Sequence, residues 1–150
     1  MAMFGGVFEH SPWVAERAWA GRPFGSVDAL HAAMVDAVGR APREVRMELI
    51  RAHPDLAANV SLTPESEREQ AAAGLNRVTP EQLERIAWLT AAYRAHFGFP
   101  FVVCAREHTP DSIIATAERR MESDPAEEEQ TALAEIAKVA RLRLADLVAT

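Results

Sequence analysis

A capping residue followed directly by proline occurs five times in this sequence, and the repeated pair limits the fold more than any other feature. Serine, threonine and aspartate side chains accept hydrogen bonds from the N–H groups that a helix start leaves without partners. Proline fits the first helical position because its missing N–H would have no partner there. Helix starts are therefore predicted at Ser11-Pro12, Thr63-Pro64, Thr79-Pro80, Thr109-Pro110 and Asp124-Pro125.

Two further starts, at Ser26 and at Ala41-Pro42, bring the prediction to seven helices. These helices are expected at residues 12–20, 27–39, 42–52, 64–73, 80–96, 110–122 and 125–148. Helical spacing of apolar residues supports the assignment. In helix 80–96 the stripe predicted to face the core comprises Leu83, Ile86, Ala87, Thr90, Tyr93 and Phe97.

No stretch alternates as a β-strand would, and one segment, Phe99–Ala105, is expected to be extended because a residue before proline avoids the helical region. The sequence thus predicts an all-α, single-domain bundle over residues 1–150 with one short extended segment. Aromatic side chains expected in the core or at an interface are Trp13, Trp19 and Trp88.

The composition, with 49% hydrophobic and 25% charged residues, is that of an ordinary globular domain. A net charge of −6 without a basic stripe argues against a nucleic-acid partner, and the apolar runs are too short to span a membrane. No signal-peptide pattern opens the chain, and its last residues are not a peroxisomal address. The single cysteine, Cys104, is expected to be buried and inert, and it fits a cytoplasmic location.

The most unusual stretch is Arg51–Leu75, where His53-Pro54-Asp55 must end one helix and a polar helix follows. The only apolar residues in helix 64–73 beyond its first proline are alanines, so burial alone does not explain its place in a fold. Ser66, Glu69 and Gln70 share one face of it. Two interpretations stay open, namely a solvated glutamate-rich helix and a polar face directed at a ligand.

Helical geometry separates two arginines near the end of the chain. At about 100° per residue, Arg143 lies on the same side as Ile136, Val139 and Leu147, whereas Arg141 lies on a polar face and is expected to be solvated. An arginine that points inward needs a partner. A substrate carboxylate and a buried structural salt bridge are both compatible with this pattern.

Five blocks of sequence in order resemble the family of the OHCU decarboxylases. They are Gly5–Trp13 (GGVFEHSPW), His53–Ala57 (HPDLA), Ser66–Leu75 (SEREQAAAGL), Phe97–Val102 (FGFPFV) and Ala140–Leu144 (ARLRL). Members of the family act on 2-oxo-4-hydroxy-4-carboxy-5-ureidoimidazoline (OHCU) at the last step of urate breakdown to (S)-allantoin. The resemblance covers nearly the whole chain.

The resemblance implies three catalytic residues, His53, Glu69 and Arg143. By themselves, a lone histidine is more often structural and a lone glutamate more often solvated, although a pKa of about 6.5 makes histidine a natural proton carrier. Substrate contacts are implied for Pro54, Ser66, Glu67, Arg68, Glu69, Gln70, Phe101, Val102, Val103, Cys104 and Ala105, with those of the 101–105 segment expected through its backbone. A homodimer is a further expectation.

The substrate of that family carries its own electron sink, a C=N unit next to the carbon that loses CO₂, so neither a cofactor nor a metal is expected. The chain also lacks a His-Glu-x-x-His or paired-cysteine pattern. His53 is expected to move protons, Glu69 to orient the ligand and Arg143 to bind its carboxylate. Two other functions fit the residues without the resemblance, a non-catalytic helical binding module and a metal-dependent hydrolase of ureido or amide bonds.

Overall fold

The structure of the chain is a computed structural model, which describes residues 7–19, 26–53, 64–72, 74 and 78–149. These residues form seven α-helices and one 3-10 turn, and none of them lies in a β-strand. The elements are α1 (Trp13–Trp19), α2 (Val27–Arg40), α3 (Arg43–Arg51), α4 (Pro64–Ala72), α5 (Pro80–Phe97), η3 (Ala105–Glu107), α6 (Pro110–Arg120) and α7 (Pro125–Ala149). The predicted all-α fold is therefore confirmed, with helix ends within two residues of those expected.

Threonine caps define the starts of α5 and α6 as the sequence predicts. The Thr79 hydroxyl accepts from the Gln82 N–H at 3.1 Å, and the Gln82 side chain accepts from the Thr79 N–H at 3.0 Å, which completes a capping box. Thr109 and Ser112 form the same arrangement at α6. At the other end of α5, Gly98 adopts φ 81°, a left-handed conformation that glycine tolerates and that ends the helix.

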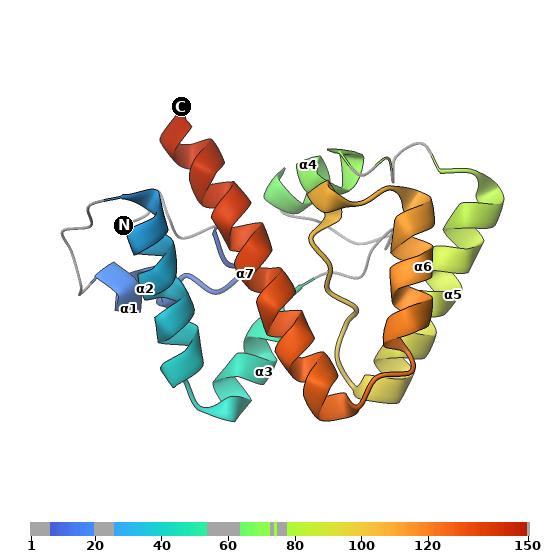
Figure 1. The fold of residues 1–150 in the computed structure, drawn as a ribbon, viewed down its shortest axis with the longest axis horizontal. Helices are drawn as coiled ribbons and strands as arrows, with labels where there is room; N and C mark the ends of the chain where they lie inside the picture. The colour runs from blue at the N-terminus through green and yellow to red at the C-terminus, as the bar shows by residue number, and fades with distance from the viewer. Residues whose placement is uncertain (1–6, 20–25, 54–63, 73, 75–77, 150) are drawn as a thin grey trace.

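The long helix α7 organises the molecule. Figure 1 shows it running diagonally between α1, α2 and α3 on one side and α5 and α6 on the other. It packs directly on α2 and α3, while α5 packs on α6. Its buried face supplies the centre of the core, where the fully covered residues are Ala132, Ile136, Ala140 and Leu144.

The extended segment after α5 is also part of the core. Phe99 and Phe101 are buried, and both meet the Tyr93 ring edge-on, at centroid distances of 5.9 and 5.3 Å. Residues 100–104 lie in neither helix nor strand, and Cys104 is extended, but Ala105, predicted to end the extended segment, already belongs to η3. The segment thus reaches α4, which contacts η3.

The predicted apolar stripe of α5 is only partly right. Ile86, Thr90 and Tyr93 are buried, but Leu83 is 42% exposed and Ala87 is exposed as well. The buried face of α5 includes Leu89 in place of Leu83 and Ala87. Helix α5 lies at the edge of the bundle and contacts α6 along one side, so the opposite side stays exposed (Figure 1).

The tryptophans expected in the core or at an interface do not share one environment. Trp88 is 60% exposed and not in the core, and its ring stacks under the Arg85 guanidinium at 5.0 Å. Trp13 is half-buried and packs against the core. The side chain of Trp19 lies outside the described residues.

Candidate active site

His53 follows the end of α3 and is buried, with 7% of its surface exposed. Its backbone N–H donates to the Ile50 carbonyl at 3.2 Å, and its ring Nδ1 lies 2.9 Å from the Leu49 carbonyl. A carbonyl only accepts, so Nδ1 must carry the hydrogen and Nε2 of the neutral ring is left as the acceptor. Burial lowers the pKa of His53 to about 4, against smaller raising effects of the Leu49 hydrogen bond and the Glu9 charge. At neutral pH the ring is therefore uncharged and basic at Nε2.

Glu69 of α4 and Arg143 of α7 form a buried, two-pronged ion pair. Arg143 Nε donates to Glu69 Oε2 at 2.8 Å and Nη2 donates to Oε1 at 2.7 Å. The two residues are 7% and 3% exposed. This pair explains how α4 is held in the fold although it has so little apolar surface, since a charge-assisted bidentate contact joins it to the central helix.

The inward orientation predicted for Arg143 is confirmed, and its partner proves to be a carboxylate of the protein itself. Arg141, expected to be solvated, lies at the surface and donates to Asp28 of α2 at 2.8 Å, with 38% of its side chain exposed. The two arginines thus differ in burial as the helical geometry predicts. The buried ion pair that the sequence left open is realised between Arg143 and Glu69.

Glu9 joins this centre from the turn before α1, a role that the sequence did not indicate. Its side chain is 2% exposed, and Oε1 lies 3.7 Å from Arg143 Nη1. The same arginine nitrogen is 3.5 Å from the Val7 carbonyl. The charges of Glu9 and Arg143 both act on His53, with opposite signs, and all three residues are buried.

Arg106 of η3 is the second cation beside Glu69, and sequence reasoning missed it too. Its Nη2 lies 3.5 Å from Glu69 Oε2 and also donates to Asp146 of α7. The Arg106 side chain is 23% exposed and that of Asp146 is 54% exposed. Glu69 therefore stands between a buried arginine and one that reaches solvent.

The extended segment is fixed to the protein at two main-chain groups. Arg120 Nη1 donates to the Val102 carbonyl at 2.7 Å, and the Cys104 N–H donates to Glu135 at 3.2 Å. Arg120 is itself held by buried Glu128, whose carboxylate is 2.7 Å from Nε. Val103 lies between the two fixed groups. Burial raises the pKa of Cys104 to about 11, which agrees with the expected buried, inert thiol.

The structure describes the side chains of only some of the other residues predicted to bind substrate. Arg68 is exposed on α4 and Gln70 is half-buried there. Pro54 lies outside the described residues, as do the side chains of Ser66 and Glu67. The prediction that these three bind substrate is therefore untested by the geometry.

The family model described as OHCU decarboxylase matches residues 1–145. The chain is 48% identical to the 2-oxo-4-hydroxy-4-carboxy-5-ureidoimidazoline decarboxylase of Haloferax volcanii over 95% of its own length and 85% of that protein. The chain belongs to the OHCU decarboxylase family.

Two other similar proteins are longer than this chain. The chain is 40% identical to the uric acid degradation bifunctional protein of Bacillus subtilis, matching 96% of the chain but 29% of that protein. A crystal structure of (S)-allantoin synthase superimposes with a TM-score of 0.75 at 30% identity, over 97% of this chain and 48% of the other. The fold of this OHCU decarboxylase family member is therefore that of a solved relative.

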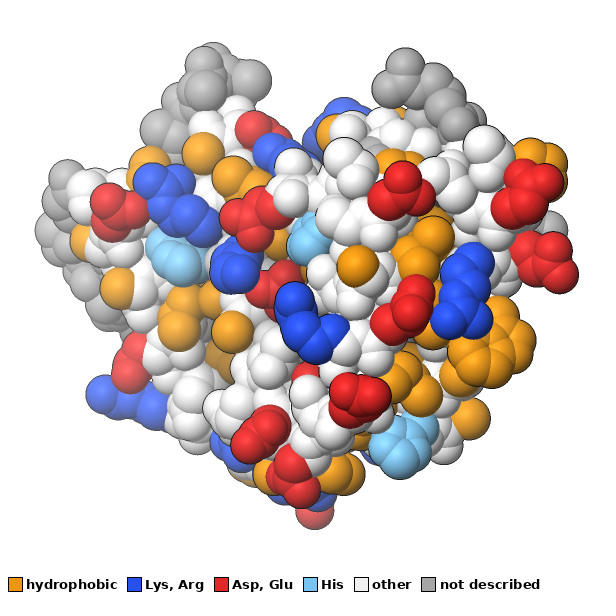
Figure 2. Space-filling view, turned by 45° about the vertical axis from the view of Figure 1, so that its right-hand side comes forward, with side chains coloured by type: hydrophobic (Ala, Val, Ile, Leu, Met, Phe, Trp, Pro, Cys, Tyr) orange, Lys and Arg blue, Asp and Glu red, His pale blue; other side chains and the backbone are white. Residues whose placement is uncertain are grey.

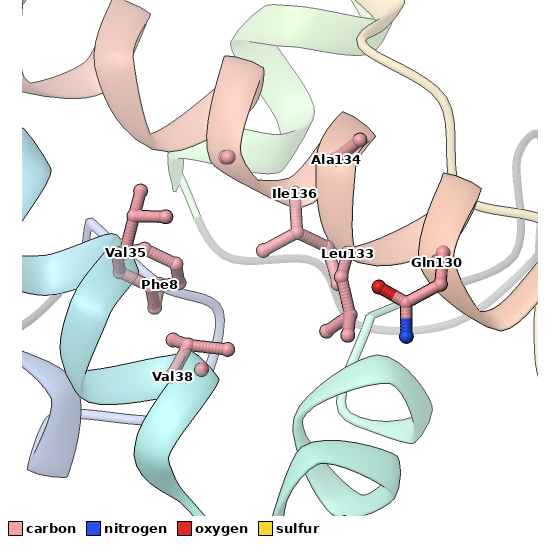
Figure 3. Close-up of a pocket in the computed structure, with 9 residues that line it drawn as sticks. Phe8, Val35, Val38, Gln130, Leu133, Ala134 and Ile136 are labelled. Carbon is pink, nitrogen blue, oxygen red and sulfur yellow. The ribbon is translucent and has the colours of Figure 1, made fainter.

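A separate hollow of about 260 Å³ lies between α2 and α7 (Figure 3). Its walls are mainly apolar, with Phe8 and Val38 facing Leu133 and Ile136, and Gln130 at its rim. None of the predicted site residues lines it. A proton-transfer centre needs titratable groups, so this hollow is not the candidate active site.

Acidic and basic side chains are interspersed over the face drawn in Figure 2, without a field of one sign. Among the described residues, no group of three or more His, Cys, Asp or Glu side chains could hold a metal ion. None of the described helices is long and apolar enough to cross a membrane.

Proposed function

We propose that this protein decarboxylates OHCU to (S)-allantoin and CO₂, the last step of urate conversion to allantoin, with His53, Glu69 and Arg143 as catalytic residues. Family membership makes the protein a carboxy-lyase. The single observation that carries the assignment of residues is that the charge of Arg143, which is paired with Glu69, acts on the buried, neutral imidazole of His53. Relatives named for uric acid degradation and for allantoin synthesis support the pathway.

His53 acts first as a base. In OHCU the hydroxyl and carboxyl groups share one carbon, so loss of CO₂ leaves an electron pair that the neighbouring C=N unit accepts. The hydroxyl proton must then leave, and a proton must arrive at the carbon that bears the ureido group. A neutral ring with Nδ1 fixed on Leu49 offers Nε2 to take the first proton, and the imidazolium so formed can deliver a proton to the second position. Solvent supplies the one proton that the overall reaction consumes.

The depressed pKa of His53 sets the direction of this exchange. An imidazolium with a pKa of about 4 gives up its proton readily at neutral pH, while the same low pKa makes the neutral ring a weaker base than an ordinary histidine. Delivery from one fixed nitrogen reaches only one face of the intermediate. This accounts for a single enantiomer of the product.

Glu69 and Arg143 hold the substrate in register with His53. Arg143 holds the Glu69 carboxylate in place with a two-pronged contact, and a buried carboxylate is an acceptor for the N–H groups of a ureido-imidazoline ligand. Substrate contacts are proposed from α4 and from the segment Phe101–Ala105, as the resemblance implies. Within that segment the Val102 carbonyl and the Cys104 N–H already have partners, so the main chain of Val103 is the better candidate.

The test is to generate OHCU in situ from urate and to follow (S)-allantoin by circular dichroism and CO₂ release. Wild-type protein should accelerate both, and His53→Gln should lower turnover by about 10² or more. Binding of substrate without CO₂ release would instead support a binding module, and loss of activity with a chelator would support a metal-dependent hydrolase. Full activity of a folded His53→Gln variant would contradict the role given to His53.

A cytoplasmic location and a homodimer are further proposals. A lone buried Cys104 fits a reducing compartment. Light scattering coupled to size exclusion would measure the oligomeric state directly, and a monomer over the working concentration range would remove the dimer from the proposal.

A further inference from the structure

The two arginines that flank Glu69 have opposite characters. Arg143 is 3% exposed, and its Nε and Nη2 donate hydrogen bonds to the two carboxylate oxygens of Glu69. Arg106 touches the same carboxylate at only 3.5 Å and makes its closer contact with Asp146, a residue that is half open to solvent. An incoming carboxylate therefore meets one arginine that is fully engaged and one whose main partner can move away.

We propose that Arg106 binds the carboxylate group of the substrate, and that this group replaces Asp146 on the guanidinium. The inference rests on the proposed function, because it assigns the contact for the group that leaves as CO₂. It differs from the role expected for Arg143, which here acts on Glu69.

The cost of exchanging partners favours Arg106. Ion pairs in which one group is largely exposed contribute little, because water solvates the carboxylate nearly as well when it is released. Removing a carboxylate from a buried arginine is strongly destabilising, because the charge is left without compensation. Asp146 can therefore leave Arg106 at small cost, whereas substrate could displace Glu69 from Arg143 only at large cost.

The charge of a second cation also acts on Asp146. Arg106 is the main cause of the lowered pKa of Asp146, and the charge of Arg68 on α4 lowers it further. Arg68 is exposed. Asp146 released from Arg106 would thus still be attracted by a second cation.

The place of Arg106 in the chain fits this role. It follows directly after the segment Phe101–Ala105, on the turn that contacts α4. A ligand that lies against that segment and against Glu69 would have Arg106 at its edge, on the side that opens to solvent. A guanidinium there can bind a carboxylate with two parallel hydrogen bonds.

This contact has a defined kinetic signature. The carboxylate loses its charge as CO₂ forms, so a guanidinium bound to it stabilises the bound substrate at least as much as the transition state. Arg106 should therefore act mainly on KM and not on kcat. The affinity for (S)-allantoin, which lacks this carboxylate, should not depend on Arg106.

The experiment compares Arg106→Gln with Asp146→Asn in the full chain, using OHCU generated from urate. Arg106→Gln should raise KM about tenfold or more, the effect of losing a charge-assisted contact, and change kcat by less than about threefold. Asp146→Asn removes the competing carboxylate and should lower KM, by about two- to fivefold. The inhibition constant of (S)-allantoin should change by less than about twofold in both variants.

Opposite signs on KM separate this role from a structural one. If the Arg106–Asp146 pair only fastens η3 to α7, both variants should impair the enzyme together, and that result would overturn the inference. Arg85→Gln is the matched control. It breaks a half-exposed ion pair, in which Arg85 Nη2 lies 3.7 Å from Glu118 Oε2, and neither residue belongs to the candidate active site. Unchanged KM in Arg106→Gln with normal wild-type turnover would refute this inference alone, whereas absence of turnover in wild type would refute the proposed function.

Discussion

Replacing Arg143 with lysine tests the centre of the site, because it keeps the charge and removes the two-pronged geometry. Arg143 reaches Glu69 with two hydrogen bonds, at 2.8 and 2.7 Å, in a region from which water is excluded. Lysine carries a point charge at the end of a flexible chain and cannot place two parallel N–H groups on one carboxylate. The variant should keep one of the two contacts at most.

The expected loss follows from the contact that disappears. A hydrogen bond between charged groups contributes about 1.5–3 kcal/mol, so Arg143→Lys should lower the free energy of unfolding by about 2 kcal/mol. Loss of the whole partner would cost more, about 3–5 kcal/mol. Because Glu69 would no longer be held in place, kcat/KM should fall about ten- to a hundredfold.

Urea unfolding followed by tryptophan fluorescence gives the stability, and (S)-allantoin formation gives the activity of the folded fraction. Arg141→Lys is the control, since its pair with Asp28 is largely exposed and should contribute about 0–1 kcal/mol. Equal stability of the two variants would refute the reasoning about burial. Lower stability with unchanged kinetics in the folded fraction would make Arg143 a structural ion-pair residue only.

Two further substitutions separate charge from shape in buried carboxylates. Glu69→Gln should keep the fold and the helix α4 but lower turnover by about tenfold or more, measured as CO₂ release, because Arg143 loses its ionic partner; wild-type turnover would contradict the role of the charge. Glu128→Gln should lower the free energy of unfolding by about 3–5 kcal/mol in urea, because buried Arg120 would lose its carboxylate at 2.7 Å. Glu129→Gln, whose partner is mostly exposed, should cost only about 0–1 kcal/mol, and a similar loss in both would contradict this estimate.

The helices were predictable from the sequence because their signals are local. A threonine before proline and a glycine after an aromatic residue each act within one turn, so Thr79 and Gly98 mark the ends of α5 correctly. Which face of α5 is covered depends instead on a neighbour distant in sequence. Leu83 and Trp88 are exposed for that reason, since only one side of α5 meets α6.

The sequence predicts the orientation of single side chains in the site, but not which residues they contact. Helical geometry gave the direction of Arg143, but geometry within one helix cannot name a partner on another, and Glu69 lies 74 positions earlier. Glu9 could not be placed because it lies in an irregular turn next to His10, which adopts φ 48°. Arg106 carries no local signal either, since its function depends on where the turn after an apolar segment meets α4.

The ionisation of His53 can be measured through stability. Burial lowers its pKa from 6.5 to about 4 in the folded protein, while the unfolded chain keeps the ordinary value. Between these two pH values the unfolded state binds a proton that the folded state does not, so the free energy of unfolding falls as the pH falls, by up to about 1.4 kcal/mol per unit. Well above pH 6.5 His53 adds no pH dependence to the free energy of unfolding, because the ring is neutral in both the folded and the unfolded state.

The difference in stability between wild type and His53→Gln isolates this contribution, because glutamine does not titrate and all other groups are shared. Relative to the variant, wild type should lose about 2 kcal/mol between pH 7 and pH 4.5, measured by urea unfolding at each pH. A difference that is constant over this range would mean that His53 takes up its proton equally in the folded and unfolded states. The ring would then be charged in the folded protein well above pH 4, and proton transfer would have to start from an acid and not from a base.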